Sequence, residues 1–265
     1  TEYLGSGAVM TEALTAGALD MPFLGGQPAF SGISNGNGVK IISMATSSST
    51  DPCLLVAADS DITDVSQLKG KNLAVNIGTD NHYQLVEMLA LGGLTEDDIN
   101  LYNLKGAEAY AALTSGEIDC MQSIAPNTYQ FVANGDARIL ATMDQTEGRN
   151  NQVLVVSPDF AEEHGDIIVR FLKVLQRAED YYKENPDECK DILVEYVGDN
   201  VDRELMDEYM DKYDCSLHLN AEDKAYLERQ YNFLYEHDML SGPVDLETIY
   251  DDSFLIEAFG TTEAH

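Results

Sequence analysis

The stretch MTEALTAGALDM, from Met10 to Met21, decides the fold because its pattern returns as AYAALTSGEIDCM from Ala109 to Met121. Each copy reads as the end of an amphipathic helix, then a glycine, then the start of a strand. Gly17 and Gly116 stand where a helix end favours a left-handed residue, a conformation that glycine adopts without strain from a Cβ atom. Two such units predict two related α/β lobes. The alternative is a chance likeness between two alanine-rich helix ends.

Both copies run into a short apolar segment and a loop that contains proline, PFLGGQPAF after the first and QSIAPNTYQF after the second. A strand that stops at Gly25-Gly26 and restarts as a helix is where α/β sheets present ligand loops. An ordinary tight turn would also place two glycines there. The equivalent loops predict ligand-binding segments that face each other across a cleft.

The amino-acid composition limits the kinds of molecule that this protein is expected to bind. The 265 residues are enough for two lobes, and 44% hydrophobic content is ordinary for a folded protein. The chain carries 47 acidic against 15 basic residues, a net charge of −32. Nucleic acids and anionic membranes are bound through clustered lysine and arginine, so this balance excludes the first and disfavours the second. We expect a self-repelling monomer whose partner is a small molecule.

Patterns of catalysis and metal binding are missing from the sequence. There is no G-x-G-x-x-G, P-loop, G-x-S-x-G or H-E-x-x-H pattern, and the five histidines are scattered. The four cysteines form no C-x-x-C pair, so we predict no cofactor and no zinc site. Cys189 and Cys215 are close enough in sequence for a disulfide, although free thiols fit equally well. No run reaches the length of a membrane-spanning helix, and TEYLGSG is not a signal peptide.

A second ligand loop is predicted where the strand Asn72–Ile77 gives way to the helix His82–Leu91. Gly78, Thr79 and Asp80 lie at the start of that helix, where unpaired N–H groups and the positive end of the helix dipole attract anions. Thr79 or Asp80 acting only as a helix cap is the alternative.

The remaining chain alternates short strands and helices until residue 159 and is helical afterwards. Further strands are predicted at Thr1–Gly7, Leu19–Leu24, Val39–Ala45, Cys53–Ala57, Ile99–Leu104, Ala137–Thr142 and Val153–Val156. Further helices are predicted at Ala8–Ala16, Ala29–Ser34, Ile167–Asn185, Pro186–Tyr196, Val201–Tyr213, Ala221–His237 and Leu246–Glu257. Polar loops are expected at Thr46–Pro52 and Asp144–Gln152.

The segment SQLKGKNLAV, Ser66 to Val75, followed by GTDNHY, Gly78 to Tyr83, resembles a pattern of ABC-transporter solute-binding proteins, D-L-K-G-K-x-(V/I)-(A/G)-V … G-S-x-x-H-x. More narrowly, it looks like their nitrate/sulfonate/taurine family, which also contains binders of thiamine-pyrimidine precursors. The same family carries L-x-x-G-x-(I/L)-D at a helix end in both lobes, as Leu14–Asp20 and Leu113–Asp119 do here. Asn185–Glu188 is similar to the family's N-P-E-E helix start.

The resemblance implies a bilobed α/β fold of the periplasmic-binding-protein type II class. We expect lobe I at residues 1–57 and 149–265, which includes the C-terminal helices, and lobe II at 58–148. Hinge strands are expected near Val56–Asp59 and Gly148–Val153. Ligand would sit in the cleft, and one lobe would close onto the other.

Two features depart from the family pattern. The family normally begins with one more strand and helix before the segment that matches Thr1–Gly7, so we expect a shortened or processed N-terminus. Many anion-binding members carry small residues where Asp80 stands. A carboxylate beside a bound anion is repelled unless it points away. Asp80 therefore either points away or pairs with an amino group of the ligand.

Candidate ligand-binding residues follow from their positions in the matching motifs, and no catalytic residue is predicted. They are Gly25, Gly26, Gln27, Gly78, Thr79, Asp80, His82, Ser123, Pro126, Asn127, Asn150 and Asn151. Phe23, Tyr83 and Tyr129 are expected as apolar walls. The resemblance implies an ABC-transporter permease as partner. It also implies an extracytoplasmic location, periplasmic or as a cell-surface lipoprotein, with the signal sequence absent from this chain.

The leading hypothesis is a receptor that delivers a small polar solute to an ABC importer, with a sulfonate-, taurine-, nitrate- or aminopyrimidine-like ligand. An enzyme on the same fold, such as a related pyrimidine-synthesis protein, is an alternative. It would need a nucleophile, and Cys120 and His82 are the residues placed for that role. A ligand-sensing domain is a third hypothesis, distinguished by a neighbouring kinase or membrane segment in the full gene.

Overall fold

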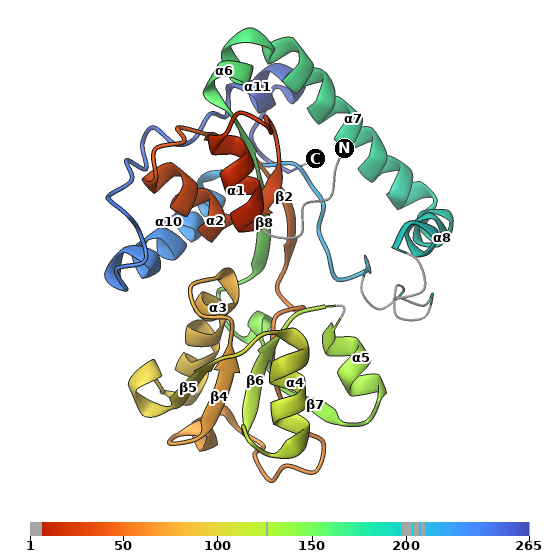
Figure 1. The fold of residues 1–265 in the computed structure, drawn as a ribbon. Coiled ribbons are helices and arrows are strands. Elements are labelled where there is room, and N and C mark those ends of the chain that lie inside the picture. The colour runs from red at the N-terminus through yellow and green to blue at the C-terminus, as the bar shows by residue number, and fades with distance from the viewer. Residues whose placement is uncertain (1–6, 126, 198–202, 204–206, 208–209, 265) are drawn as a thin grey trace. The chain divides into compact units, whose positions relative to one another are not determined.

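The computed structural model describes residues 7–125, 127–197, 203, 207 and 210–264 (Figure 1). The chain forms two compact units. Unit 1 comprises Thr1–Ser47, Asn151–Pro186 and Asp214–His265, and unit 2 comprises Ser48–Asn150 and Asp187–Tyr213. The strand expected at Thr1–Gly7 and most of the helix expected at Val201–Tyr213 lie outside the described residues.

Unit 1 is built on a three-stranded sheet. Its strands are β1 (Phe23–Gly25), β2 (Lys40–Ser48) and β8 (Asn150–Val156), in the order β1-β8-β2. The last residue of β2 and the first of β8 already belong to unit 2. β1 runs antiparallel to β8, with Leu24 opposite Val153. Both residues are buried, and they join one continuous core with the surrounding helices.

Six helices complete unit 1 among its described residues. They are α1 (Gly7–Thr15), α2 (Gly26–Ser34), α6 (Pro158–Glu163), α7 (Gly165–Glu184), α10 (Ala221–Glu236) and α11 (Ser253–Phe259). α7 places Ile168 and Leu172, one turn apart, in the core and ends just before Pro186. α11 packs against α7.

Unit 2 is built on a five-stranded sheet. Its strands are β3 (Cys53–Ala57), β4 (Asn72–Val75), β5 (Asn100–Asn103), β6 (Cys120–Ser123) and β7 (Ala137–Thr142), in the order β5-β4-β6-β3-β7. β5, β4 and β6 run parallel, whereas β3 is antiparallel to β6 and β7. The parallel strands therefore bring the loops after β4 and β6 to the same edge of the sheet.

Helices cover both faces of this sheet. α3 (Asp80–Leu89) lies on one face, α4 (Gly106–Ser115) lies on the other, and α5 (Asn127–Ala133) packs against β7. The unit also contains α8 (Pro186–Val197), apart from its first residue, and the 3₁₀ turns η1 (Val65–Leu68), η2 (Ala90–Gly92), η3 (Glu96–Asp98) and η4 (Met143–Gln145). Leu54 and Cys120 join a core with α3, while the alternate residues Leu55 and Met121 join a second core with α4. Figure 1 shows α4 lying across the sheet.

The α/β class predicted from the sequence is confirmed. The repeated motif forms the helix ends before β1 and β6, and Gly17 and Gly116 adopt left-handed φ values of 66° and 75°. Three local predictions were wrong. β2 continues to Ser48 because Ser47 bridges Asp214, and β8 begins at Asn150 because Gln152 pairs with Gly25. Residues 246–252 are a turn rather than a helix, held where Tyr250 bridges Ile41.

Candidate functional site

The loop after β4 delivers the chain into the first turn of α3. Gly78 has a φ of 78°, a conformation that favours glycine. Thr79 is the N-cap residue, but its hydroxyl donates to the Asn76 carbonyl at 2.7 Å and makes no cap hydrogen bond. The His82 N–H donates to the Thr79 carbonyl at 2.9 Å, and the start of α3 carries the partial positive charge of a helix N-terminus. Asp80 occupies the first helical position and is half-buried.

The His82 side chain contacts this loop through a hydrogen bond. Its side chain is buried, the Gly78 N–H donates to Nδ1 at 3.4 Å, and Nε2 lies 2.6 Å from Oε1 of Glu96. These contacts are both satisfied when the proton sits on Nε2 and is donated to the carboxylate. Both ring nitrogens are therefore engaged within unit 2, where His82 holds the loop, and its contact with a ligand stays a prediction.

The loop after β6 lies at the same sheet edge. The buried Ser123 hydroxyl accepts from Oγ1 of Thr128 at 2.9 Å. Asn127 begins α5 and is exposed, whereas Pro126 lies outside the described residues. Tyr129 is buried, and the Lys212 ammonium lies 4.4 Å above the centre of its ring.

A buried carboxylate, Asp51, lies beneath this edge and was missed by the sequence reasoning. Its Oδ1 accepts from the Ala125 N–H at 2.5 Å, and its Oδ2 accepts from the Tyr213 hydroxyl and from Nδ2 of Asn150, the latter at 3.4 Å. Burial raises the pKa of Asp51 above its ordinary value, although the hydrogen bond from Tyr213 opposes this shift. Asp51 thereby joins three segments that are distant in sequence.

Asn150 connects Asp51 to two buried glutamines. Its Oδ1 accepts from Nε2 of Gln84 at 3.4 Å, and the Oε1 of Gln84 accepts from Nε2 of Gln122 at 3.0 Å. Gln84 is fully buried on α3 and Gln122 is 5% exposed on β6. The signal available in the sequence was a glutamine directly after the apolar residues Cys120 and Met121 in a short strand, CMQS, where a buried polar group needs partners.

The candidates in unit 1 gather around α10. Gly25 is the N-cap of α2, and a Cβ atom on Gly26 would lie 2.2 Å from Oε1 of Gln230 on α10. Nε2 of Gln230 also donates to Oδ1 of the buried Asn151 at 3.3 Å. Gln27 is 1% exposed. The structure therefore brings Gly26 and Asn151 to the same glutamine.

The predicted apolar walls pack within their own units. Phe23 lies against Phe171, with ring centres 6.3 Å apart, and Tyr83 is buried on α3.

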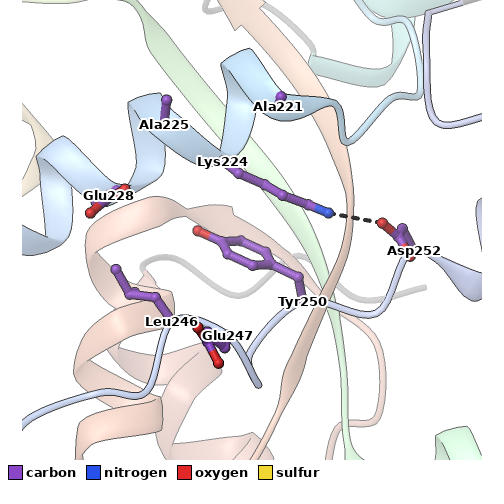
Figure 2. A pocket seen from close by; sticks show the side chains of 8 residues that line it. All are labelled: Ala221, Lys224, Ala225, Glu228, Leu246, Glu247, Tyr250 and Asp252. Atoms are coloured by element: carbon purple, nitrogen blue, oxygen red, sulfur yellow. Dashed lines mark hydrogen bonds and ion pairs between the residues drawn. The ribbon is translucent and has the colours of Figure 1, made fainter.

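Unit 1 also contains a pocket of about 700 Å³ between α10 and the turn before α11. Its lining, drawn in Figure 2, is Ala221, Lys224, Ala225, Glu228, Leu246, Glu247, Tyr250 and Asp252. The Lys224 ammonium is paired with Asp252 at 2.8 Å, so the remaining carboxylates leave the pocket acidic. Of the candidate residues that the structure describes, none lines this pocket.

The Tyr250 hydroxyl in this pocket is buried and has no hydrogen-bond partner among the described residues. Burial, and then the charge of Glu228, raise its pKa.

Tyr250→Phe is expected to leave the free energy of unfolding unchanged or to raise it by about 1 kcal/mol, because it removes an unpaired polar group. Tyr231→Phe is the matched control, since the Tyr231 hydroxyl accepts from the Val244 N–H at 3.3 Å and its loss should destabilise. Urea denaturation followed by circular dichroism compares them, and a clear loss in Tyr250→Phe would contradict the expectation.

Within the described parts of the chain, no group of three or more His, Cys, Asp or Glu side chains is arranged to hold a metal ion. No helix in those parts is both long enough and apolar enough to cross a bilayer. All four cysteines are free thiols.

Known proteins resemble this chain over most of its length. The NMT1/THI5-like family matches residues 5–189. A Bacillus subtilis protein assigned to aliphatic-sulfonates binding is 26% identical over 254 residues, 96% of this chain and 76% of its own. The taurine-binding periplasmic protein of Escherichia coli is 28% identical over 185 residues, 69% of this chain and 57% of its own.

A solved structure gives the same fold. The periplasmic aliphatic sulphonate-binding protein SsuA from Escherichia coli superposes with a TM-score of 0.84 at 23% identity, over 93% of this chain and 80% of its own. This likeness confirms the predicted periplasmic-binding-protein fold. The family match spans both units and includes the motifs around Gly78 and Gly116. The chain therefore belongs to the NMT1/THI5-like family.

Proposed function

We propose that this protein is an extracytoplasmic solute-binding protein that binds a small organic sulfonate and passes it to an ABC importer. The observation that carries the proposal is the start of α3, where the Gly78 turn leads into backbone N–H donors and the positive end of the helix dipole. A sulfonate group presents three oxygen acceptors to such donors. The relatives that match this chain are named for binding aliphatic sulfonates and taurine.

Because the protein is strongly negative, an anionic ligand needs hydrogen-bond donors close to it in the site. The chain carries a net charge of −32, so its long-range field repels anions. The positive end of α3 and its N–H groups supply attraction over a few ångströms, where the far charges are screened by salt. We propose Gly78 and Thr79 as the anion contacts, with Asp80 directed away from the sulfonate. The other candidate residues, including those in unit 1, stay predictions.

Partner and location follow from the same proposal. A solute-binding protein of this family requires a membrane permease, and the taurine-binding relative is named as periplasmic. We therefore propose an ABC permease as the partner and a monomeric receptor outside the cytoplasm. The closure of two lobes on the ligand remains a prediction.

The cysteines support a binding protein over an enzyme. Cys120, the residue placed for a nucleophile, is fully buried, and burial raises the pKa of its thiol. Burial likewise raises the pKa of Cys53 to about 12. A nucleophilic cysteine needs a lowered pKa and access to substrate. The relatives reported above are binding proteins.

A thermal-shift screen tests the proposal. Ethanesulfonate, taurine and other small sulfonates are expected to raise the melting temperature, because a ligand at a hundred times its dissociation constant adds about 2.7 kcal/mol of stability. Sodium chloride at equal ionic strength is the control for salt effects. Nitrate and aminopyrimidines form the comparison set. Stabilisation by aminopyrimidines alone, with no response to any sulfonate, would overturn the proposal.

A further inference from the structure

The buried amides of unit 2 form a hydrogen-bond chain with one direction. It starts at Asp51, whose two carboxyl oxygens accept each of the hydrogen bonds that the structure gives them. Three donors surround it, namely the Ala125 N–H, the Tyr213 hydroxyl and the amide of Asn150. Asn150 must therefore turn its NH₂ group toward Asp51 and its carbonyl oxygen away.

The orientation of Asn150 fixes the orientations of the next two amides in the hydrogen-bond chain. The Asn150 oxygen can be satisfied only by a donor, so Gln84 presents its NH₂ group to Asn150, at 3.4 Å, and its oxygen to Gln122. Gln122 then presents its NH₂ group to Gln84, at 3.0 Å, and to the Ser123 carbonyl, at 3.4 Å. Each amide is held in one of its two flipped forms by the carboxylate at the far end.

The hydrogen-bond chain ends at the Oε1 atom of Gln122. This oxygen is buried and has no hydrogen-bond partner within the described part of the structure. Gln122 lies near the carboxyl end of β6, beside β4, whose own carboxyl end leads into the Gly78 turn. A buried carbonyl oxygen that lacks a hydrogen-bond donor destabilises the protein. A ligand that donates to this oxygen therefore gains more binding free energy than it would from the same hydrogen bond at a water-exposed position.

We propose that Gln122 selects ligands that carry an N–H or O–H donor in addition to the anionic group, and that Asp51 sets this preference through Asn150 and Gln84. The proposal rests on the proposed function and names its substrate class, small sulfonates with an amine or hydroxyl group. Gln122 is the residue that contacts the ligand. Asp51 is a positioning residue that acts through the two amides.

Calorimetric titration with taurine and ethanesulfonate tests the selection, since the two differ by the amine. Wild type is expected to bind taurine at least about ten-fold more tightly, the range of one hydrogen bond to a charged donor. Gln122→Met should abolish this difference by weakening taurine binding and leaving ethanesulfonate binding nearly unchanged. Gln130→Met, at an exposed position of α5, is the matched control and should keep the difference.

Asp51→Asn separates a directional role from a merely structural one. An asparagine that keeps its oxygen on the Ala125 N–H turns its own NH₂ group toward Asn150. Asn150, Gln84 and Gln122 must then all flip, and Gln122 would present a donor to the ligand. The variant is expected to prefer sulfoacetate, which carries an acceptor carboxylate, over taurine, whereas wild type prefers taurine.

The outcomes distinguish the two proposals. Equal affinity of wild type for taurine and ethanesulfonate would overturn the selection by Gln122 and leave sulfonate binding intact. Equal weakening of both ligands by Gln122→Met would show a structural role only and also overturn it. An unchanged preference in Asp51→Asn would overturn the role of Asp51. Failure of every sulfonate to bind wild type would overturn the proposed function itself.

Discussion

Phe30→Ala is expected to lower the free energy of unfolding of unit 1 by about 4 kcal/mol. Phe30 is fully buried in α2, one turn after the helix begins at Gly26, and its ring centre lies 5.7 Å from that of Tyr231 on α10. Truncation removes the ring and leaves a cavity that α2 and α10 cannot close, because both are held by the surrounding core. The first turn of α2, which contains the candidate residues Gly26 and Gln27, should loosen with it.

Urea denaturation followed by circular dichroism measures this loss. The chain has 14 tyrosines and no tryptophan, so tyrosine fluorescence provides a second probe. Phe30→Leu is the control, because it keeps most of the volume and should cost about 1 kcal/mol. A loss below about 1 kcal/mol in Phe30→Ala would show that the site collapses or is less tightly packed than the structure indicates.

Gly92→Ala is expected to destabilise unit 2 by about 3 kcal/mol. A Cβ atom at this position would lie 2.5 Å from the backbone nitrogen of Ser66 and 2.7 Å from the carbonyl carbon of Val65. Backbone atoms cannot rotate away as a side chain can. The η1 turn is moreover fixed by a capping box between Asp64 and Gln67, so it resists the displacement.

Gly93→Ala is the matched control for this change. The space around Gly93 is open, but its φ of 67° strains an alanine, so a smaller loss of about 1 kcal/mol is expected. A shift of the urea midpoint at constant slope would identify both changes as losses of stability. If the two glycines gave equal losses, the close approach of η2 to η1 would not be the cause.

Local patterns were enough to predict most strands and helices. Cys53–Ala57 is an apolar run between Pro52 and an acidic turn, and it forms β3 with the same bounds. The α7 helix was predicted from its apolar spacing and from Pro186 beyond its end. Errors arose where distant partners decide the structure. Tyr250 bridges Ile41, so the residues before α11 form a turn despite their helical spacing.

The candidate site was predicted in part for the same reason. The Gly78 turn and the start of α3 are encoded by adjacent residues, so the motif revealed them. Asp51, Gln84 and Gln122 carry no such motif, because each reads locally as an ordinary polar residue. Their roles depend on hydrogen bonds between residues that are tens of positions apart in the sequence. These hydrogen bonds form only when the sheet of unit 2 is assembled.

The interleaved order of the two units sets the sequence of events during synthesis. Most of unit 2 is one continuous segment, Ser48–Asn150, which holds all five strands of its sheet. The core of unit 1 instead waits for Leu255 in α11, which is fully buried and packs with residues from the first segment. At typical translation rates the ribosome needs roughly 5–20 s to pass from Asn150, where the long segment of unit 2 ends, to α11. During this interval the apolar strands β1 and β2 are exposed, and a holding chaperone has its longest opportunity to bind them.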